Sequence, residues 1–153
     1  MKRIKFPDRR IEGVRSRGDT FDRVSYDNIE ISHSIFEDTT WTHCRFDRVL
    51  FASSNRFSSC RFTRCRFDKQ HTYLGAVFRD CVFEECEFRN IQFWGSKFEK
   101  CTFSGRLDNI VFYGPEASES WRTVLSEVDF SAARFEFVDF RCGIDLSTTR
   151  MPI

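Results

Sequence analysis

Seven cysteines and three histidines are the side chains best suited to nucleophilic, redox or metal chemistry in this chain. Two cysteine pairs, Cys60/Cys65 and Cys81/Cys86, have the spacing Cys-x4-Cys. Zinc sites typically combine a Cys-x2-Cys pair with a second pair of ligands, which is absent here. No histidine stands in a motif with a nucleophile, and there is no glycine-rich phosphate loop. We therefore predict no catalytic, cofactor-binding or metal site and no enzymatic activity, with a metal or redox role for the thiols as the alternative.

Six of the cysteines recur at long, regular steps, which indicates a structural role. Two series have steps of 20 or 21 residues: Cys44, Cys65 and Cys86, and Cys60, Cys81 and Cys101. Buried cysteine behaves as a small hydrophobic residue, so we expect each series to form an internal column of reduced, metal-free thiols. Cys142 falls outside both series, and we expect it to be the one thiol open to reaction.

A shorter period in the sequence must position these columns. Phenylalanine recurs every five residues, and all but Phe6 and Phe137 of the 19 follow this phase. The longest run is Phe78, Phe83, Phe88, Phe93, Phe98 and Phe103. A helix repeats every 3.6 residues or so and a strand every two, so neither buries this pattern on one face. The chain must turn a corner every five residues, and the cysteine steps indicate four sides per coil.

The repeated segments resemble a known family. CRFTRCRF, CVFEECEF and IDLST are similar to the pentapeptide-repeat consensus A-(D/N)-L-x-x, over roughly residues 21–112 and 128–148. The resemblance implies an all-β fold, a right-handed quadrilateral β-helix. In that fold the central Phe or Leu and the small residue two positions before it fill the interior.

The repeat divides one predicted domain, residues 1–153, into four parts. These are an N-terminal cap or basic arm at 1–20, repeats at 21–112, an insertion at 113–127 and a final coil at 128–148. The insertion begins with Gly114, Pro115 and Glu116, which resembles a helix start. Apolar residues then follow with helical spacing: Trp121, Val124, Leu125 and Val128. We therefore predict one short α-helical insertion near residues 116–126.

One side of the predicted solenoid lacks charge. Four windows along it contain no charged residue: Val49–Ser53, His71–Gly75, Ile91–Gly95 and Ile110–Gly114. A stack of large apolar groups on the exterior needs a cover. The inserted helix could fold over it, or a partner or second copy could bind there. The predicted partner-binding residues are Leu74, Trp94, Tyr113 and Trp121.

Composition limits the classes of partner. The chain has 24 basic and 23 acidic side chains, so its net charge gives no reason to bind nucleic acid or a membrane surface. No signal peptide and no apolar run long enough to span a bilayer is present. We expect a cytoplasmic protein, because a reducing compartment keeps free thiols reduced.

Two functions remain as hypotheses. The first is a non-enzymatic protein-binding or shielding module, such as an antitoxin or immunity factor, with a protein partner or self-association and no small-molecule substrate. The second comes from the resemblance alone, because known family members protect type II topoisomerases from quinolones or toxins by imitating duplex DNA. Such imitation requires a strongly anionic rod, whereas residues 21–112 contain 13 basic and 13 acidic side chains. This balance favours the first hypothesis.

Overall fold

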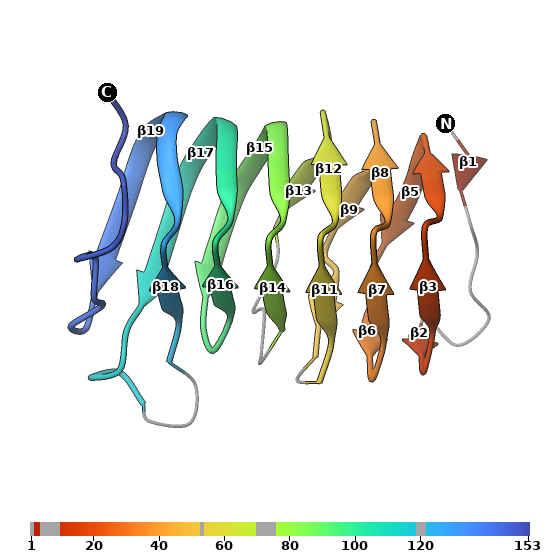
Figure 1. Cartoon of the computed structure of the whole chain (residues 1–153), viewed down its shortest axis with the longest axis horizontal. Helices are drawn as coiled ribbons and strands as arrows, with labels where there is room; N and C mark the ends of the chain where they lie inside the picture. The colour runs from red at the N-terminus through yellow and green to blue at the C-terminus, as the bar shows by residue number, and fades with distance from the viewer. Residues whose placement is uncertain (1, 4–9, 53, 70–75, 119–121) are drawn as a thin grey trace.

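The computed structural model describes residues 2–3, 10–52, 54–69, 76–118 and 122–153. These residues form a rod of parallel β-strands, with the two chain termini at opposite ends (Figure 1). The strands are β1 (Lys2–Arg3), β2 (Arg10–Glu12), β3 (Arg15–Arg17), β4 (Thr20–Asp22), β5 (Val24–Asp27), β6 (Glu30–Ser32), β7 (Ile35–Glu37), β8 (Thr40–Thr42), β9 (Arg45–Asp47), β10 (Leu50–Phe51), β11 (Arg56–Ser58), β12 (Arg61–Thr63), β13 (Arg66–Asp68), β14 (Val77–Arg79), β15 (Val82–Phe93), β16 (Lys97–Glu99), β17 (Thr102–Tyr113), β18 (Val124–Ser126) and β19 (Asp129–Arg141).

Strand pairing gives the rod four faces, each named here after its first short strand. The β3 face contains β3, β7, β11, β14, β16 and β18, which form one row in the lower half of Figure 1. The β4 face continues through β8 and β12, and the β5 face through β9 and β13. The β2 face begins with β2, β6 and β10. The long strands β15, β17 and β19 turn through the β4, β5 and β2 faces in succession.

The corners between faces contain residues in the left-handed conformation. Along the corner after the β5 face, Arg48, Asn90 and Asn109 have φ angles of 53°, 55° and 57°. This conformation costs most residues energy, and Asn tolerates it better than most. One such residue per repeat turns the chain onto the next face, which explains the five-residue period. The predicted all-β parallel solenoid is confirmed.

The interior is a stack of phenylalanine rings. Phe83 stacks on Phe62 and Phe103, with ring centroids 4.9 and 4.6 Å away. Across the corner, the ring of Phe88 meets that of Phe83 at 68° and 5.5 Å. Rings therefore stack along the rod and pack edge to face within a coil, which are two favourable aromatic geometries. Phe83 and Phe88 are only 1 % and 2 % exposed, so the predicted core is confirmed.

The thiol columns lie beside the rings. The six cysteines of the two series are buried, and Cys142 is half-buried, as the spacing predicted. Each buried thiol donates to a backbone carbonyl; that of Cys86 lies 3.1 Å from the Phe62 oxygen. The Cys44 thiol lowers the pKa of Cys65, but the Cys86 thiol and burial outweigh it and raise that pKa to about 12. Their environment therefore favours neutral thiols.

The prediction of a helix near residues 116–126 was wrong. A turn spans residues 115–117, residues 119–121 lie outside the described part of the chain, and β18 follows. Leu125 of β18 lies beside Phe98 in the neighbouring coil, so it is a core residue of the β3 face. Consecutive repeats place inward residues alternately two and three positions apart. Leu125 and Val128 therefore have a spacing that a helix shares, and the sequence pattern could not separate the two structures.

One side of one coil is a residue short. Phe103 and Leu107, both buried core residues, are four positions apart, and the register between β15 and β17 shifts at this point. Gly105 occupies the corner with φ of +108°, and a Cβ there would lie 2.2 Å from the Cys86 carbonyl oxygen. Only glycine fits this approach without displacing backbone. The missing residue interrupts the corner between the β4 and β5 faces.

Candidate protein-binding face

The β2 face carries the uncharged residues that the sequence singled out. At its N-terminal end it is charged, since Arg10 and Glu30 form an ion pair at 3.7 Å. The next described outward residues are Leu50 and Ala52, both half-buried. Among the described residues, the outward side chains of this face are uncharged from its third rung as far as Tyr113.

An aromatic pair lies on this face towards its C-terminal end. The rings of Trp94 and Tyr113 stack with centroids 4.1 Å apart and planes 18° apart, and both side chains are half-buried. Trp94 follows β15, and Tyr113 ends the adjacent strand β17, where Ile91 pairs with Ile110. Beneath them, Phe93 stacks on Phe112 at 4.8 Å. The inner stack fixes the backbone under the outer one, so the pair is held ready for a contact.

Charged residues close the face at its C-terminal end. Arg141 of β19 pairs in register with Tyr113 and donates a hydrogen bond to Asp139 at 2.8 Å. Asp139 raises the pKa of Arg141, and Tyr113 contributes less to the same shift. The uncharged part of the face therefore ends in a polar rim. The sequence already contains this boundary in the segment VDFRC, but its register against Tyr113 is a product of the fold.

The structure describes two of the four predicted partner-binding residues. The structure brings Trp94 and Tyr113 together, whereas Leu74 and Trp121 lie outside the described residues. Sequence reasoning missed Gln92, which is exposed beside Val111 on the same face and makes it partly polar. After the insertion the chain returns at once to the rod. The Thr123 amide donates to the Tyr113 carbonyl, and its hydroxyl donates to the Phe93 carbonyl, both at 2.8 Å.

Two of the histidines contact carboxylates at the surface. His43 lies 3.8 Å from Asp22, and Thr42 donates a hydrogen bond to the same carboxylate at 2.6 Å. That bond is the main cause of the lowered pKa of Asp22. The Thr42 hydroxyl therefore bonds to the acid rather than to the imidazole, so nothing activates it as a nucleophile. The described residues contain no cluster of three His, Cys, Asp or Glu side chains placed to hold a metal ion.

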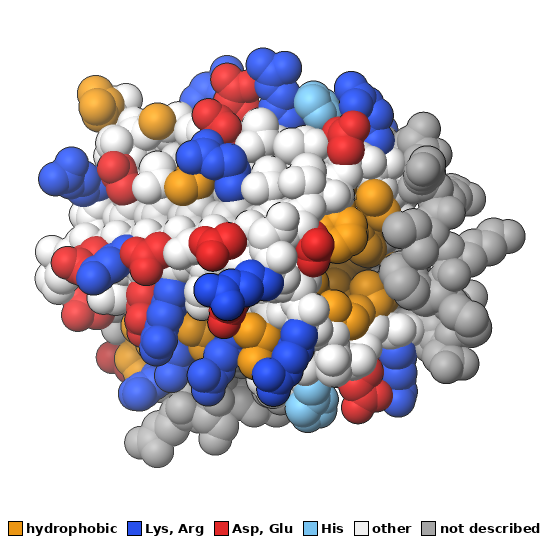
Figure 2. All heavy atoms as spheres, turned by 45° about the vertical axis from the view of Figure 1, so that its right-hand side comes forward, with side chains coloured by type: hydrophobic (Ala, Val, Ile, Leu, Met, Phe, Trp, Pro, Cys, Tyr) orange, Lys and Arg blue, Asp and Glu red, His pale blue; other side chains and the backbone are white. Residues whose placement is uncertain are grey.

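Two hollows differ in chemistry. One, of about 230 Å³, lies at the N-terminal end and has an almost wholly apolar lining that includes Ile11, Phe21 and Trp41 (Figure 2). It offers no polar group to orient a reacting molecule. The other, of about 520 Å³, lies at the short corner and is lined by both acids and bases, among them Glu85 and Arg134. Among the residues that the structure describes, neither hollow has the converging donors of an active site.

The β5 face carries charge in two neighbouring columns. Asp27, Asp47 and Asp68 lie on successive coils in one column, and Arg45 and Arg66 lie beside them in the other. Arg66 donates to Asp68 at 2.7 Å. Burial opposes ionisation of Asp68, but the hydrogen bonds from Arg66 and a neighbouring asparagine outweigh it and lower its pKa. The acids on this face are thus accompanied by bases along the rod.

The described part of the chain contains no helix that is long and apolar enough to cross a membrane. Between its charged ends, the described outward residues of the β2 face are uncharged: Leu50, Ala52, Gln92, Trp94, Val111 and Tyr113. Because Trp and Tyr combine apolar area with a polar group, they are frequent anchors of protein interfaces.

Comparisons with known proteins agree with this fold. The family model described as Pentapeptide repeats (8 copies) matches residues 75–105. No curated protein sequence matches the chain. Full-length QnrB1, a plasmid-mediated fluoroquinolone resistance protein, is similar in structure with a TM-score of 0.50 and 18 % identity, over 93 % of this chain and 81 % of that one.

A second solved structure is similar to this chain to the same degree by TM-score. The pentapeptide repeat protein Rfr23 from the cyanobacterium Cyanothece 51142 has a TM-score of 0.50 and 8 % identity, over 95 % of this chain and 92 % of that one. At such identities the likeness concerns the fold. Residues 75–105 thus match pentapeptide repeats, and the chain has a β-solenoid fold similar to that of solved pentapeptide-repeat proteins.

Proposed function

We propose that this chain is a non-enzymatic protein-binding module that contacts its partner through the β2 face around Trp94 and Tyr113. The observation that carries the proposal is the stacked, half-exposed pair of aromatic rings on an uncharged stretch of a rigid sheet. Interface hot spots are enriched in Trp and Tyr, and they contribute most where little ordering is needed on binding.

Charge placement supports protein binding over imitation of duplex DNA. A DNA mimic needs an uninterrupted acidic surface, but the acids of the β5 face stand beside arginines. Arg48 pairs with Asp27 at 2.7 Å, and Arg106 forms ion pairs with Asp108 and Glu136. A shielding role, such as that of an immunity factor, fits a rod with mixed charges. Six buried thiols also favour a reducing compartment, and we propose the cytoplasm.

The test compares Trp94→Asp with Thr40→Asp, two changes that place the same carboxylate at half-buried positions on different faces, the β2 face and the β4 face. Purified wild-type and variant chains are used to capture proteins from a lysate of the native host, and the captured proteins are quantified by mass spectrometry. We expect Trp94→Asp to lose a partner that Thr40→Asp retains, with unchanged melting temperatures for both.

Two other results would point elsewhere. A fall of several degrees in the melting temperature of Trp94→Asp alone would mean that the face is covered by the chain itself. A wild-type dimer that becomes a monomer in Trp94→Asp, measured by sedimentation, would identify the partner as a second copy. Identical capture by wild type and Trp94→Asp would contradict the proposal.

A further inference from the structure

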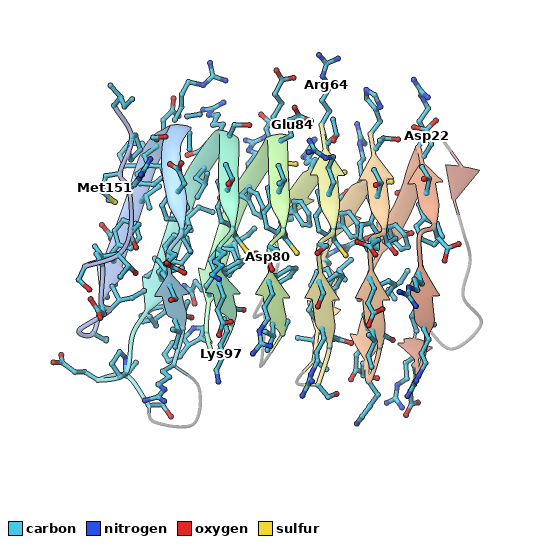
Figure 3. All side chains as sticks on the ribbon, viewed as in Figure 1. Asp22, Arg64, Asp80, Glu84, Lys97 and Met151 are labelled. Carbon is cyan, nitrogen blue, oxygen red and sulfur yellow. The ribbon has the colours of Figure 1, made fainter. Side chains whose placement is uncertain are left out.

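A single column on the β3 face alternates positive and apolar side chains. Strand register places its six members on successive coils, in this order: Arg15, Ile35, Arg56, Val77, Lys97 and Val124. The three cationic residues are exposed, and the three β-branched residues are half-buried. Lys97 projects from β16 in Figure 3, and Figure 2 shows hydrophobic side chains lying between Lys and Arg side chains on the surface.

The cations of this column have no acidic partner in the described part of the chain. Arg15, Arg56 and Lys97 take part in none of its ion pairs or side-chain hydrogen bonds. The neighbouring column on the same face is different. There Arg17 pairs with Glu37 at 3.9 Å, and Arg79 pairs with Glu99 at 2.9 Å. The unneutralised charge of this face therefore lies along one line.

Repulsion between stacked cations does not by itself explain the alternation. On the β5 face, Arg45 and Arg66 lie in register on adjacent coils, and so do Asp47 and Asp68. The solenoid therefore tolerates like charges on neighbouring rungs. A β-branched residue between two cations also gives their aliphatic stems an apolar surface to lie on. The column thus presents charge and apolar area together, which is a combination suited to recognition.

The spacing of the column matches an α-helix better than a strand. Coils lie about 4.8 Å apart, so successive cations are about 9.6 Å apart. Residues seven apart on one helix face are separated by about 10.5 Å. Residues on one face of an extended strand repeat every 6.8 Å or so. Neither one step nor two steps along such a strand matches the distance between successive cations. Long, flexible Arg and Lys side chains can absorb the difference of about 1 Å per step for a helix.

We propose that this column binds an acidic amphipathic α-helix of a protein partner, lying along the rod. Acidic residues at every seventh position would face Arg15, Arg56 and Lys97. Apolar residues three or four positions further would face Ile35 and Val77. This inference rests on the proposed function, protein binding, and adds the chemical class of the partner.

The column also lies next to the aromatic pair. Trp94 and Lys97 flank the corner at Gly95, whose φ is 74°, and Ser96 between them points into the core with no exposed area. A helix on the column would therefore lie along the edge of the β2 face. A partner that covers both surfaces would contact Trp94 with a neighbouring element.

Nucleic acid and lipid fit the column less well. A polyanionic surface would also meet Glu37 and Glu99, which belong to the same face. The half-buried Ile35 and Val77 would lie against phosphate groups, which offer these side chains no apolar contact. An amphipathic helix offers carboxylates and apolar side chains in alternation, so it matches both components.

The experiment uses a synthetic helical peptide as the probe. The peptide has glutamates at every seventh position and leucines three and four positions after each glutamate, on an alanine and glutamine background. Its matched control has the same composition with the glutamates moved to the opposite helical face. We expect fluorescence anisotropy to show binding of the probe to the full chain, weakened by added salt, and little binding of the control.

Variants of the full chain locate the binding. We expect Arg56→Glu to weaken probe binding by about tenfold, since reversal of an interfacial charge adds repulsion to the lost attraction. Arg45→Glu on the opposite, β5 face should leave it unchanged. Val77→Ser should weaken it by a few fold, while Val82→Ser on the β4 face should not. Circular dichroism checks folding, and Arg56→Ala replaces the reversal if that variant does not fold.

Other outcomes would overturn the inference. Equal affinity for probe and control, or equal weakening by Arg56→Glu and Arg45→Glu, would mean that only diffuse charge attraction acts. Tighter binding to phosphatidylserine vesicles or to a DNA duplex than to the probe, lost in Arg56→Glu, would assign the column to another class of partner. Failure of the proposed binding through Trp94 and Tyr113 is detected separately, because it is measured by partner capture with Trp94→Asp.

Discussion

The middle coils and the last coil are made from the same repeat but differ in burial. Phe67 and Phe88, in β13 and β15, stack at 4.5 Å and are each only 2 % exposed. In β19, Phe140 stacks on Phe112 at 5.1 Å but is half-buried. Phe130, also in β19, is fully buried, and the C-terminal segment pairs beside it through the bridge between Asp129 and Arg150. A core ring is therefore fully buried where chain lies on each side of it. In a solenoid, stability therefore comes from stacking between neighbours.

The largest expected effect separates these two regions directly. Phe88→Ala removes a ring that is packed on both sides and should lower the free energy of unfolding by about 3–5 kcal/mol. Phe140→Ala removes a ring packed on one side and should cost about 1–2 kcal/mol. Reversible urea unfolding measures both values. Equal costs would show that burial by a second coil is not the source of the difference.

The short corner between the two regions should be the next most sensitive position. Gly105→Ala places a methyl group 2.2 Å from the Cys86 carbonyl oxygen at a φ of +108°, so the backbone must move. We expect a loss of more than about 2 kcal/mol, measured by thermal unfolding. Gly18→Asn is the control, because Gly18 has open space and a φ of +70°. Its stability should change by less than about 0.5 kcal/mol. A tolerated Gly105→Ala would mean that this corner can relax.

The thiol columns of the middle coils should make stability fall at alkaline pH. The pKa of Cys65 and of Cys81 is raised to about 12 in the folded chain, against about 8.5 in an unfolded one. The folded state keeps its protons over this interval and the unfolded state loses them. Stability is therefore complete below about pH 8.5 and declines towards pH 12, by up to about 1.4 kcal/mol per pH unit for each thiol.

Urea unfolding across this pH range measures that slope. Cys65→Ala should reduce it, and alanine already occupies the equivalent buried position at Ala76. The same slope in Cys65→Ala as in the wild type would show that this thiol is not responsible for the alkaline loss.

The smallest expected effect should be equal in the two regions. Arg79 and Glu99 form an ion pair at 2.9 Å in the middle coils, and Arg141 and Asp139 form one at 2.8 Å in the last coil. Both arginines are more than half exposed, and the Glu99 side chain is 38 % exposed. Arg79→Ala and Arg141→Ala should therefore each cost less than about 1 kcal/mol. A substantially larger loss for either variant would mean that surface charge contributes to the stacking of coils.

Much of the fold follows from local pattern. The five-residue phase identified the buried rings, such as Phe83, and the long steps identified buried thiols, such as Cys86. Both follow because the interior of a narrow coil excludes water and leaves no room for long polar side chains, so apolar residues and small residues that bond to backbone carbonyls recur there. The same argument identified Trp94 and Tyr113 as outward residues on one face.

The neighbours of outward residues were decided only by the tertiary structure. Whether residue 125 belonged to a helix or a strand depended on its pairing with β16 across an insertion. The alternation of Arg56, Val77 and Lys97 likewise depends on how many residues each coil contains. Sequence determined which side chains point inward, because burial selects residue type at every repeat. The register between coils depends on every corner, on the insertions and on the one shortened side. Exposed positions place little restriction on residue type. Only the folded chain therefore determines which surface residues meet.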